Sequence, residues 1–326
     1  MKAALFTGAG GPEVITIGTA ATPVPGPNDI RVRVRAAGLN RADLMQRRGH
    51  YPAPAGWPAD IPGLEYAGEV EAAGDRVQRW RVGDRVMGLV GGGAQAEAVV
   101  VHEDETLRIP DQLSFAEAAA VPEAFLTAYD ALVTRARLTA GERVLIHAVG
   151  SGVGTAAVQI AKQLGATVVG TSRTAAKLER AREYGLDEGI DTSQVNFADA
   201  ISAPVDVVID VLGGPALPHN LSVLAPRGRL VLLGWLLGSK VDADFNPVLR
   251  KRLEIIGSVM RPRLHADRVE VVRGFSEQML PRFDVSRFSP PLRPVLERTV
   301  PMNQLAAAHA AMERNETFGK LVAVWD

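Results

Sequence analysis

The chain contains no cysteine among its 326 residues. That absence excludes disulfides, thiol nucleophiles, Cys-ligated zinc sites and iron–sulfur clusters at once. An excess of charge is also missing, because 36 Lys and Arg residues face 37 Asp and Glu residues and leave a formal net charge of -1. Without a basic excess, we expect no nucleic acid and no anionic membrane among the partners.

Long apolar runs are absent too, since no stretch approaches the roughly 20 residues that a membrane-spanning helix needs. The opening residues lead quickly into Gly/Pro turns and lack the pattern of a secretory signal. We therefore expect a cytoplasmic protein. The composition, with 47% hydrophobic and 22% charged residues, is typical of a globular chain, and this length usually forms about two domains.

The first third of the chain has the pattern of short strands separated by turns. Residues 30–35 alternate three apolar residues with three arginines, as a half-exposed antiparallel strand does. The segments 66–72, 84–89 and 95–101 alternate in the same way. We interpret this part as a strand-rich, barrel-like domain.

Strand and helix patterns alternate from Glu142 onward. Apolar strands are predicted at 143–148, 167–171, 188–191, 205–211, 229–233 and 254–260, with helices between them at 153–164, 175–184 and 217–224. Continuous Val/Ile/Leu runs are typical of strands buried on both faces, and short crossover helices require parallel pairing. The sequence therefore predicts an α/β fold with a doubly wound parallel sheet of about six strands.

The last part of the chain leaves this alternation. Helices are predicted near 269–280 and 305–313, followed by a strand at 320–325. The simplest inference is that this tail returns to complete the first domain.

A glycine-rich turn, His147 to Gly154, joins the first predicted parallel strand to its helix. Glycines permit a tight turn and let backbone N–H groups approach a pyrophosphate at the helix N-terminus. Val149 and Ser151 replace the first two glycines of the G-x-G-x-x-G pattern, but the strand before and the helix after support dinucleotide binding. The alternative is a plain strand-to-helix turn. We assign cofactor binding to Gly150, Ser151, Gly152, Val153 and Gly154.

The second predicted parallel strand ends without a carboxylate. An enzyme that uses NAD carries Asp or Glu there, whereas one that uses NADP carries cations and hydroxyls. Hydroxyls and positive charge stand at this strand end, which favours a 2′-phosphate and hence NADPH. The residues are Thr171, Ser172, Arg173, Thr174 and Lys177. The alternative is that Arg173 and Lys177 are only solvated residues at a helix start.

Together these motifs resemble the medium-chain dehydrogenase/reductase superfamily, and within it the zinc-free quinone oxidoreductases related to zeta-crystallin. The similarity runs through nearly the whole chain, is most specific at 40–47 and 122–124, and looks closest to the stress-inducible quinone oxidoreductase-like branch. The resemblance implies a strand-rich GroES-like catalytic domain at 1–120, a Rossmann domain at 121–262, and a return to the catalytic domain at 263–326.

Zinc-dependent members of the superfamily hold a catalytic metal with Cys, His and Cys. The corresponding positions here are Asn40 or its neighbour, Leu64 and Glu123. Leucine cannot ligate a metal, so the resemblance implies a site without one. We expect hydride transfer from NADPH to a quinone or similar conjugated carbonyl, whose added charge delocalises onto an oxygen.

The resemblance also assigns roles to single residues. It implies that Asn40 and Asp43 orient the site, that Tyr51 donates a hydrogen bond to substrate or cofactor, and that Thr127 contacts the nicotinamide. It places four further residues along the cofactor: Gly213, Gly234, Gly319 and Lys320. Structural alternatives stand beside these roles, because Asn40 can cap a helix that begins at Arg41, Asp43 can serve its first turn, and Tyr51 can pack against the Pro-rich loop.

Two other functions stay open at this point. One is an NADPH-dependent enoyl or alkenal reductase, and the other is a non-catalytic nucleotide- or RNA-binding protein, against which the neutral charge argues. The apolar segment 254–260 is predicted to lie at a sheet edge. Unpaired edges are a liability, and the resemblance implies that this strand pairs across a two-fold axis in a homodimer.

Overall fold

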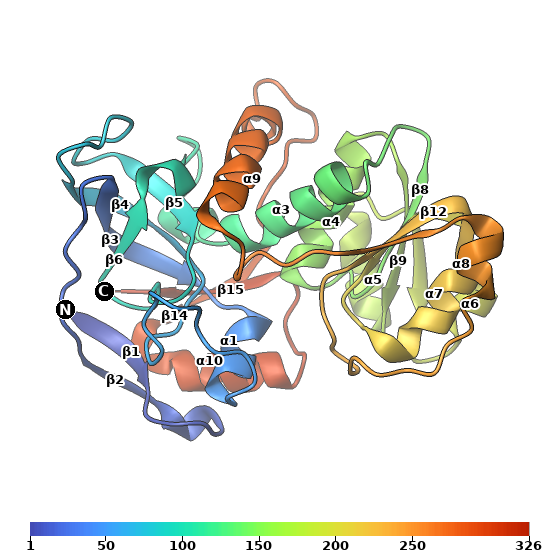
Figure 1. The fold of residues 1–326 in the computed structure, drawn as a ribbon, viewed down its shortest axis with the longest axis horizontal. Helices are drawn as coiled ribbons and strands as arrows, with labels where there is room; N and C mark the ends of the chain where they lie inside the picture. Colours follow the sequence, from blue (N-terminus) through green and yellow to red (C-terminus); the bar gives the residue numbers. More distant parts are fainter. Residues whose placement is uncertain (326) are drawn as a thin grey trace. The chain divides into compact units, whose positions relative to one another are not determined.

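The computed structural model describes residues 1–325, which form two compact units (Figure 1). Unit 1 comprises Met1–Leu126 and the residues from Met260 onward, and unit 2 comprises Thr127–Val259. The first division falls inside helix α3 (Pro122–Tyr129), which continues as a π-helical turn at Asp130–Arg135. From the sequence alone, a helix is predicted here at about residues 127–134, so the start of α3 at Pro122 is earlier than the prediction.

Unit 2 is built on a six-stranded sheet in which all neighbours are parallel, in the order β10-β9-β8-β11-β12-β13. The strands are β8 (Arg143–Ile146), β9 (Thr167–Ser172), β10 (Glu188–Asp191), β11 (Val205–Asp210), β12 (Leu224–Leu232) and β13 (Glu254–Gly257). The predicted doubly wound sheet is confirmed. Its last strand is shorter than the predicted 254–260.

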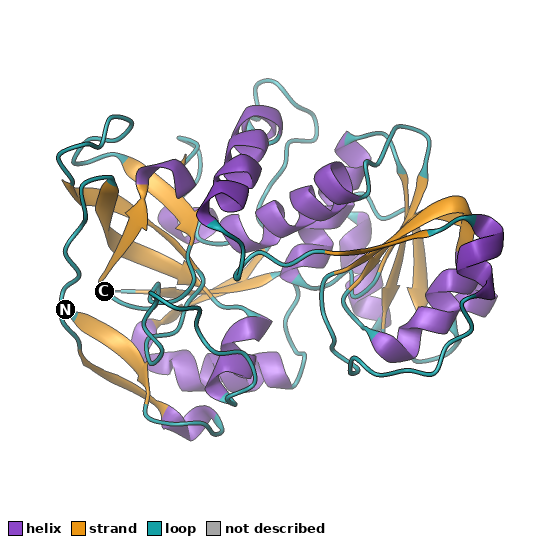
Figure 2. Ribbon diagram, viewed as in Figure 1, coloured by secondary structure: helices purple, strands orange, loops and turns teal. Residues whose placement is uncertain are grey.

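Helices cover both faces of this sheet (Figure 2). In Figure 1, α4 (Gly152–Gln163) and α5 (Ala175–Arg182) lie on one side, and α6 (Phe197–Ala200), α7 (Leu217–Val223) and α8 (Asn246–Lys251) lie on the other. Because both faces are covered, strand residues such as Leu145, Val169 and Val208 are fully buried. The sequence analysis missed α6 and α8, which are too short to show helical periodicity.

Unit 1 is strand-rich, as predicted. Its seven-stranded sheet has the order β14-β15-β3-β4-β5-β7, with β6 paired to β3, and a separate pair joins β1 to β2. The strands are β1 (Lys2–Phe6), β2 (Ile15–Thr19), β3 (Asp29–Gly38), β4 (Glu65–Ala73), β5 (Arg85–Leu89), β6 (Ala98–His102), β7 (Thr106–Arg108), β14 (Leu296–Pro301) and β15 (Lys320–Val324).

Strand β3 shows why this sheet forms. Ile30, Val32 and Val34 are buried in the core, while the intervening arginines point outward. Arg31 pairs with Glu71 of β4 at 2.5 Å, and Arg35 pairs with Glu69 at 2.6 Å. Such solvent-accessible ion pairs contribute little energy, so burial of the apolar face stabilises the strand.

The C-terminal segment joins the N-terminal one within unit 1. Strand β15 pairs antiparallel with β3, with Val322 opposite Gly38 and Val324 opposite Ala36. The helices of this unit are α1 (Arg41–Arg47), α2 (Phe115–Ala118), α9 (His265–Gln278) and α10 (Leu305–Glu313). Among residues 1–325, no helix is long and apolar enough to cross a membrane.

Candidate active site

The glycine turn of unit 2 connects β8 to α4 as the sequence predicts. Ser151 is the N-cap of α4, and its Oγ accepts a hydrogen bond from the Gly154 N–H at 3.0 Å. A Cβ on Gly154 would overlap the carbonyl oxygen of Ala148 and approach Val149 Cα within 2.7 Å. Only glycine lets the helix start this close to the end of the strand, which leaves the helix N-terminus open to an anion.

The five residues predicted to hold a 2′-phosphate gather at the end of β9 and the start of α5. Thr171 and Ser172 are buried, Arg173 and Thr174 are exposed, and Lys177 is half-buried in the first turn of α5. In the neighbouring strand β10, Asp191 lies opposite Ser172. The Asp191 carboxylate accepts hydrogen bonds from the backbone N–H and the hydroxyl of Ser193.

The remaining predicted glycines of unit 2 follow the next strands. Gly213 has a φ of +95°, and a Cβ there would lie 2.5 Å from the carbonyl oxygen of Gly238. Gly234 follows β12, and a Cβ there would make only ordinary contacts, at 3.5 Å from the Val211 carbonyl oxygen. Glycine is thus required at Gly213 and not at Gly234.

Thr127 lies at the N-terminal boundary of unit 2. Its side chain is 9% exposed, and no group among residues 1–325 forms a hydrogen bond with its hydroxyl. A buried hydroxyl without a partner costs free energy, so this atom is suited to a ligand contact.

A buried network that the sequence analysis missed links three strand ends of unit 2. His147 contacts the Thr171 hydroxyl through Nδ1 at 2.9 Å and the Asn220 amide oxygen through Nε2 at 2.8 Å. Asn220 Nδ2 donates to the Asp210 carboxylate at 3.1 Å. Because an amide oxygen only accepts, Nε2 carries the proton, and burial lowers the pKa of His147 to about 4. The neutral imidazole therefore links the start of the glycine turn to Thr171 and Asn220 by hydrogen bonds.

Asp210 extends the network to the loop after β11. Its carboxylate accepts from the Leu212 N–H at 2.6 Å and from the Gly213 N–H at 3.3 Å. Burial raises the pKa of Asp210 to about 6, and the two backbone donors oppose that rise. In the sequence, the only sign of this role is that the acidic Asp210 stands at the end of an apolar strand.

Unit 1 contains a group of polar and ionisable residues, which we name the lysine cluster: Asn40, Asp43, Glu65 and Lys320, which are buried, and the half-buried Glu123. The Lys320 ammonium donates to Asn40 Oδ1 at 2.5 Å and to the Leu39 carbonyl at 2.9 Å. It also forms an ion pair with Glu65 Oε1 at 2.5 Å, and Asn40 Nδ2 donates to the same oxygen at 2.9 Å. Two hydrogen bonds and one ion pair therefore satisfy the ammonium.

The two other carboxyl groups of the lysine cluster hold protons more tightly than usual. Burial raises the pKa of Asp43 to about 6, opposed by the Asn40 N–H, which donates to Asp43 at 2.8 Å, and by Lys320. Burial also raises the pKa of Glu123 to about 7, and nearby Glu65 and Asp43 add to the rise. Both groups can exchange protons near neutral pH.

Asn40 and Asp43 also have the structural roles that stood as alternatives. Asn40 is the N-cap of α1, and Asp43 accepts its backbone N–H from the first turn of that helix. The Asn40 side chain, by contrast, points to Glu65 and Lys320. Gly319, with a φ of +78°, forms the turn that leads Lys320 into the cluster.

Tyr51 lies half-buried in the loop after α1. The guanidinium of Arg261, a residue that the sequence analysis missed, is 4.9 Å from the centre of its ring. The charge of Arg261 also acts on Asp43, and that of Glu123 acts on Tyr51. The predicted catalytic residues Asn40, Asp43 and Tyr51 therefore belong to one electrostatic neighbourhood within unit 1.

The residues at the superfamily's zinc position do not fit a zinc ion. Leu64 is buried and offers no donor, and the oxygens of Asn40 and Glu65 converge on the Lys320 ammonium. Among residues 1–325, no group of three or more His, Cys, Asp or Glu side chains is placed to hold a metal ion.

Comparison with known proteins agrees with both units. Residues 26–111 match the family model described as "Alcohol dehydrogenase GroES-like domain", and residues 152–276 match "Zinc-binding dehydrogenase". The chain is 36% identical to a Pseudomonas aeruginosa protein named "Quinone oxidoreductase", over 97% of each chain.

Two solved structures have the same fold. A quinone oxidoreductase from Pseudomonas syringae pv. Tomato DC3000 superposes with a TM-score of 0.85 at 30% identity, covering 99% of both chains. The CurK enoyl reductase superposes with a TM-score of 0.86 at 28% identity, covering 100% of this chain and 99% of that one.

The fold, the glycine turn and these matches define an oxidoreductase of the medium-chain dehydrogenase/reductase superfamily, whose members use nicotinamide cofactors. Within it, the chain belongs to the quinone oxidoreductase-like subfamily.

The glycine turn yields a direct prediction. The Gly154→Ala variant is expected to bind a nicotinamide dinucleotide at least about tenfold more weakly, because the added methyl group displaces the Ala148–Val149 backbone of the turn. Titration of NADPH fluorescence with each purified variant measures the dissociation constant. The matched control is Gly8→Ala, where a Cβ meets nothing within 4 Å. An unchanged constant for Gly154→Ala would contradict the assignment.

Proposed function

We propose that this protein is an NADPH-dependent quinone oxidoreductase that transfers hydride without a metal ion. The observation that carries the proposal is the lysine cluster, in which the oxygens of Asn40 and Glu65 bind an ammonium. A site of this composition suits an acceptor that is already activated, such as a quinone, better than an alcohol that needs a Lewis acid.

The residues of unit 2 fit a dinucleotide. The turn from Gly150 to Gly154 and the N-terminus of α4 would hold the pyrophosphate, and the hydroxyls and cations at 171–174 and Lys177 would hold the 2′-phosphate. The Thr127 hydroxyl would contact the nicotinamide. Gly213 and Gly234 would line the cofactor. The bound nicotinamide supplies the hydride.

The residues of unit 1 would manage charge on the substrate. A quinone that accepts a hydride becomes a hydroquinone anion, and one proton completes the hydroquinone. The Tyr51 hydroxyl would donate a hydrogen bond to the oxygen on which this charge develops, while Asn40 and Asp43 orient the site. Glu123, with its pKa raised to about 7 by burial, is a suitable store for the proton.

A second candidate function is favoured by the likeness to an enoyl reductase. An enoyl thioester is a conjugated carbonyl and would need the same oxygen donor, so the residues above do not distinguish the two. A short enoyl thioester therefore belongs in the substrate panel.

We also propose a homodimer that forms through the edge of the unit 2 sheet. Within the described residues, β13 pairs only with β12, which leaves its other edge open, and Ile255 is 38% exposed. The strand ends at Gly257 and not at residue 260, because Ser258 turns inward and its hydroxyl donates to Asp130 at 2.5 Å. The pairing segment is thus Glu254–Gly257.

The cofactor and the reaction are tested together. We expect purified protein to oxidise NADPH in preference to NADH with a simple ortho- or para-quinone, and a chelator to leave the rate unchanged. In the Arg173→Ala variant, the KM for NADPH should rise about tenfold while that for NADH stays constant, because only NADPH carries the 2′-phosphate that this guanidinium would bind. Arg182→Ala at the end of α5, where the guanidinium pairs with Glu179, is the control.

Three outcomes of that assay decide between functions. Turnover of the enoyl thioester with no quinone turnover would replace the quinone by the second candidate. NADPH binding without turnover of either substrate would point to a non-catalytic role. Absence of NADPH binding would overturn the cofactor assignment.

The role of Tyr51 is tested by removing its hydroxyl. We expect Tyr51→Phe to lower kcat for quinone reduction at least about tenfold, because the developing oxyanion loses a donor. The dissociation constant for NADPH should stay constant, since the assigned cofactor contacts are untouched. Tyr184→Phe in unit 2 serves as the control. Unchanged kcat/KM for every accepted quinone would show that Tyr51 is not the donor.

The dimer is tested by sedimentation velocity at micromolar concentration. We expect a dimer for the unmodified chain and a monomer for Ile255→Lys, because a charge on the edge strand opposes strand pairing. Val82→Lys, an exposed position of unit 1, should remain dimeric. A monomeric unmodified chain would refute the proposal.

A further inference from the structure

Arg261 is a buried cation whose role no sequence motif indicates. Its side chain is 7% exposed and lies in unit 1, just after the chain returns from unit 2. Nε donates to the Gly91 carbonyl at 2.7 Å, Nη1 to the Tyr51 carbonyl at 3.0 Å, and Nη2 to Gln46 Oε1 at 2.6 Å. Each nitrogen of the guanidinium therefore binds a different segment of unit 1.

These three bonds surround the loop that carries Tyr51. Gln46, which accepts from Arg261, is itself buried in α1 and donates to the Ala59 carbonyl at 3.0 Å. The Arg261–Gln46 pair thus binds the loop at two points, the Tyr51 carbonyl and the Ala59 carbonyl. The loop between them has no helix or strand of its own, and these two side chains bind it near both of its ends.

Arg261 also contacts the Tyr51 side chain itself. The guanidinium carbon lies 4.9 Å from the ring centre, within the range of a cation–π interaction. A guanidinium is suited to this place because its planar, delocalised fork can stack on a ring and donate in several directions at once. A lysine ammonium at the same place could not keep three directed bonds and the ring contact.

We propose that Arg261 is a positioning residue for the reaction: it holds the backbone and the ring of Tyr51 so that the hydroxyl is presented to the substrate oxygen at one fixed place. The inference rests on the proposed role of Tyr51 in quinone reduction. Arg261 acts through Tyr51 and contacts neither substrate nor cofactor.

An electrostatic consequence accompanies the contact. Burial raises the pKa of the Tyr51 hydroxyl, the Arg261 charge opposes that rise, and Glu123 adds to it. Loss of the guanidinium therefore leaves the tyrosine both less fixed and less acidic.

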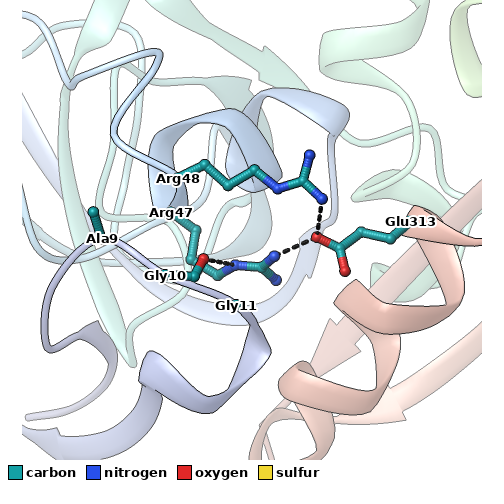
Figure 3. Close-up of a pocket in the computed structure, with 6 residues that line it drawn as sticks. All are labelled: Ala9, Gly10, Gly11, Arg47, Arg48 and Glu313. Atoms are coloured by element: carbon teal, nitrogen blue, oxygen red, sulfur yellow. Dashed lines mark hydrogen bonds and ion pairs between the residues drawn. The ribbon is translucent and has the colours of Figure 1, made fainter.

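The chain offers a matched control in a second buried arginine of unit 1. Arg47 donates to the Gly10 carbonyl at 3.1 Å, contacts His309 Nδ1 at 3.2 Å and pairs with Glu313, beside a cavity of about 390 Å³ (Figure 3). It lies at the end of α1 away from the Asn40 cap. Substitution of Arg47 removes a buried cation next to Gln46 in α1 and leaves the contacts of Tyr51 unchanged.

The first experiment is a double-mutant cycle on quinone reduction with Arg261→Lys, Tyr51→Phe and the double variant. We expect Arg261→Lys to lower kcat about tenfold with Tyr51 present and less than about twofold in the Tyr51→Phe background, because contacting residues couple. Arg47→Lys should cost the same factor in both backgrounds. Equal losses for Arg261→Lys in both backgrounds would overturn the proposal.

The second experiment does not depend on turnover. The whole protein is labelled with 3-fluorotyrosine, and the Tyr51 signal is assigned by its loss in Tyr51→Phe among the four tyrosines of the chain. We expect Arg261→Met to shift this signal and to raise its titration midpoint, while Arg47→Met leaves both unchanged. An unaltered signal and midpoint in folded Arg261→Met would refute the proposal.

The two readouts separate this inference from the proposed function. If Tyr51→Phe reduces quinones at the normal rate, the role of Tyr51 fails and the fluorine spectra still test whether Arg261 holds its ring. If Tyr51→Phe is slow and the cycle shows no coupling, the proposed function stands and the role of Arg261 is refuted.

Discussion

The buried ammonium of Lys320 is the interaction on which unit 1 depends. It joins the residue before α1, the start of β4 and the start of β15, which are up to 281 positions apart in the chain. A buried charge is tolerated only when its partners satisfy it, and here three acceptors do so. Removal of the ammonium would leave Glu65 as an uncompensated buried carboxylate, so the N-terminal and C-terminal parts of unit 1 are tied by electrostatics as well as by the β3–β15 ladder.

The same ammonium opposes the effect of burial on the pKa values of Asp43 and Glu123. The Lys320 cation acts on Glu65, Asp43 and Glu123, with Arg261 acting on Asp43 as well, and the two cations do not neutralise all three carboxylates. Glu65 takes the direct contact, and the pKa values of Asp43 and Glu123 rise to about 6 and about 7 through burial. Unit 2 also buries ionisable groups. Its buried His147 is neutral and hydrogen-bonds to Asn220, which in turn donates to Asp210.

The sequence predicted the parts of the fold that depend on local pattern. Buried parallel strands show as apolar runs, and the helix at 305–313 has the predicted bounds. Strand β14 and the early start of α3 at Pro122 were missed, because neither has a clear period. The partners of Lys320 and the contacts of Arg261 could not be predicted, since nothing in the local sequence encodes which residues 170 or 281 positions away will meet.

These long-range contacts are also what distinguishes the candidate chemistry from the superfamily's metal-dependent branch. A zinc ion would both neutralise acids and polarise a substrate oxygen. Lys320 can do only the first, because its buried ammonium is held by hydrogen bonds to Leu39 and Asn40 and by the ion pair with Glu65. Under the proposed function, polarisation of the substrate therefore falls to a group outside the lysine cluster, and Tyr51, fixed by a stacked guanidinium, is the hydroxyl that unit 1 provides.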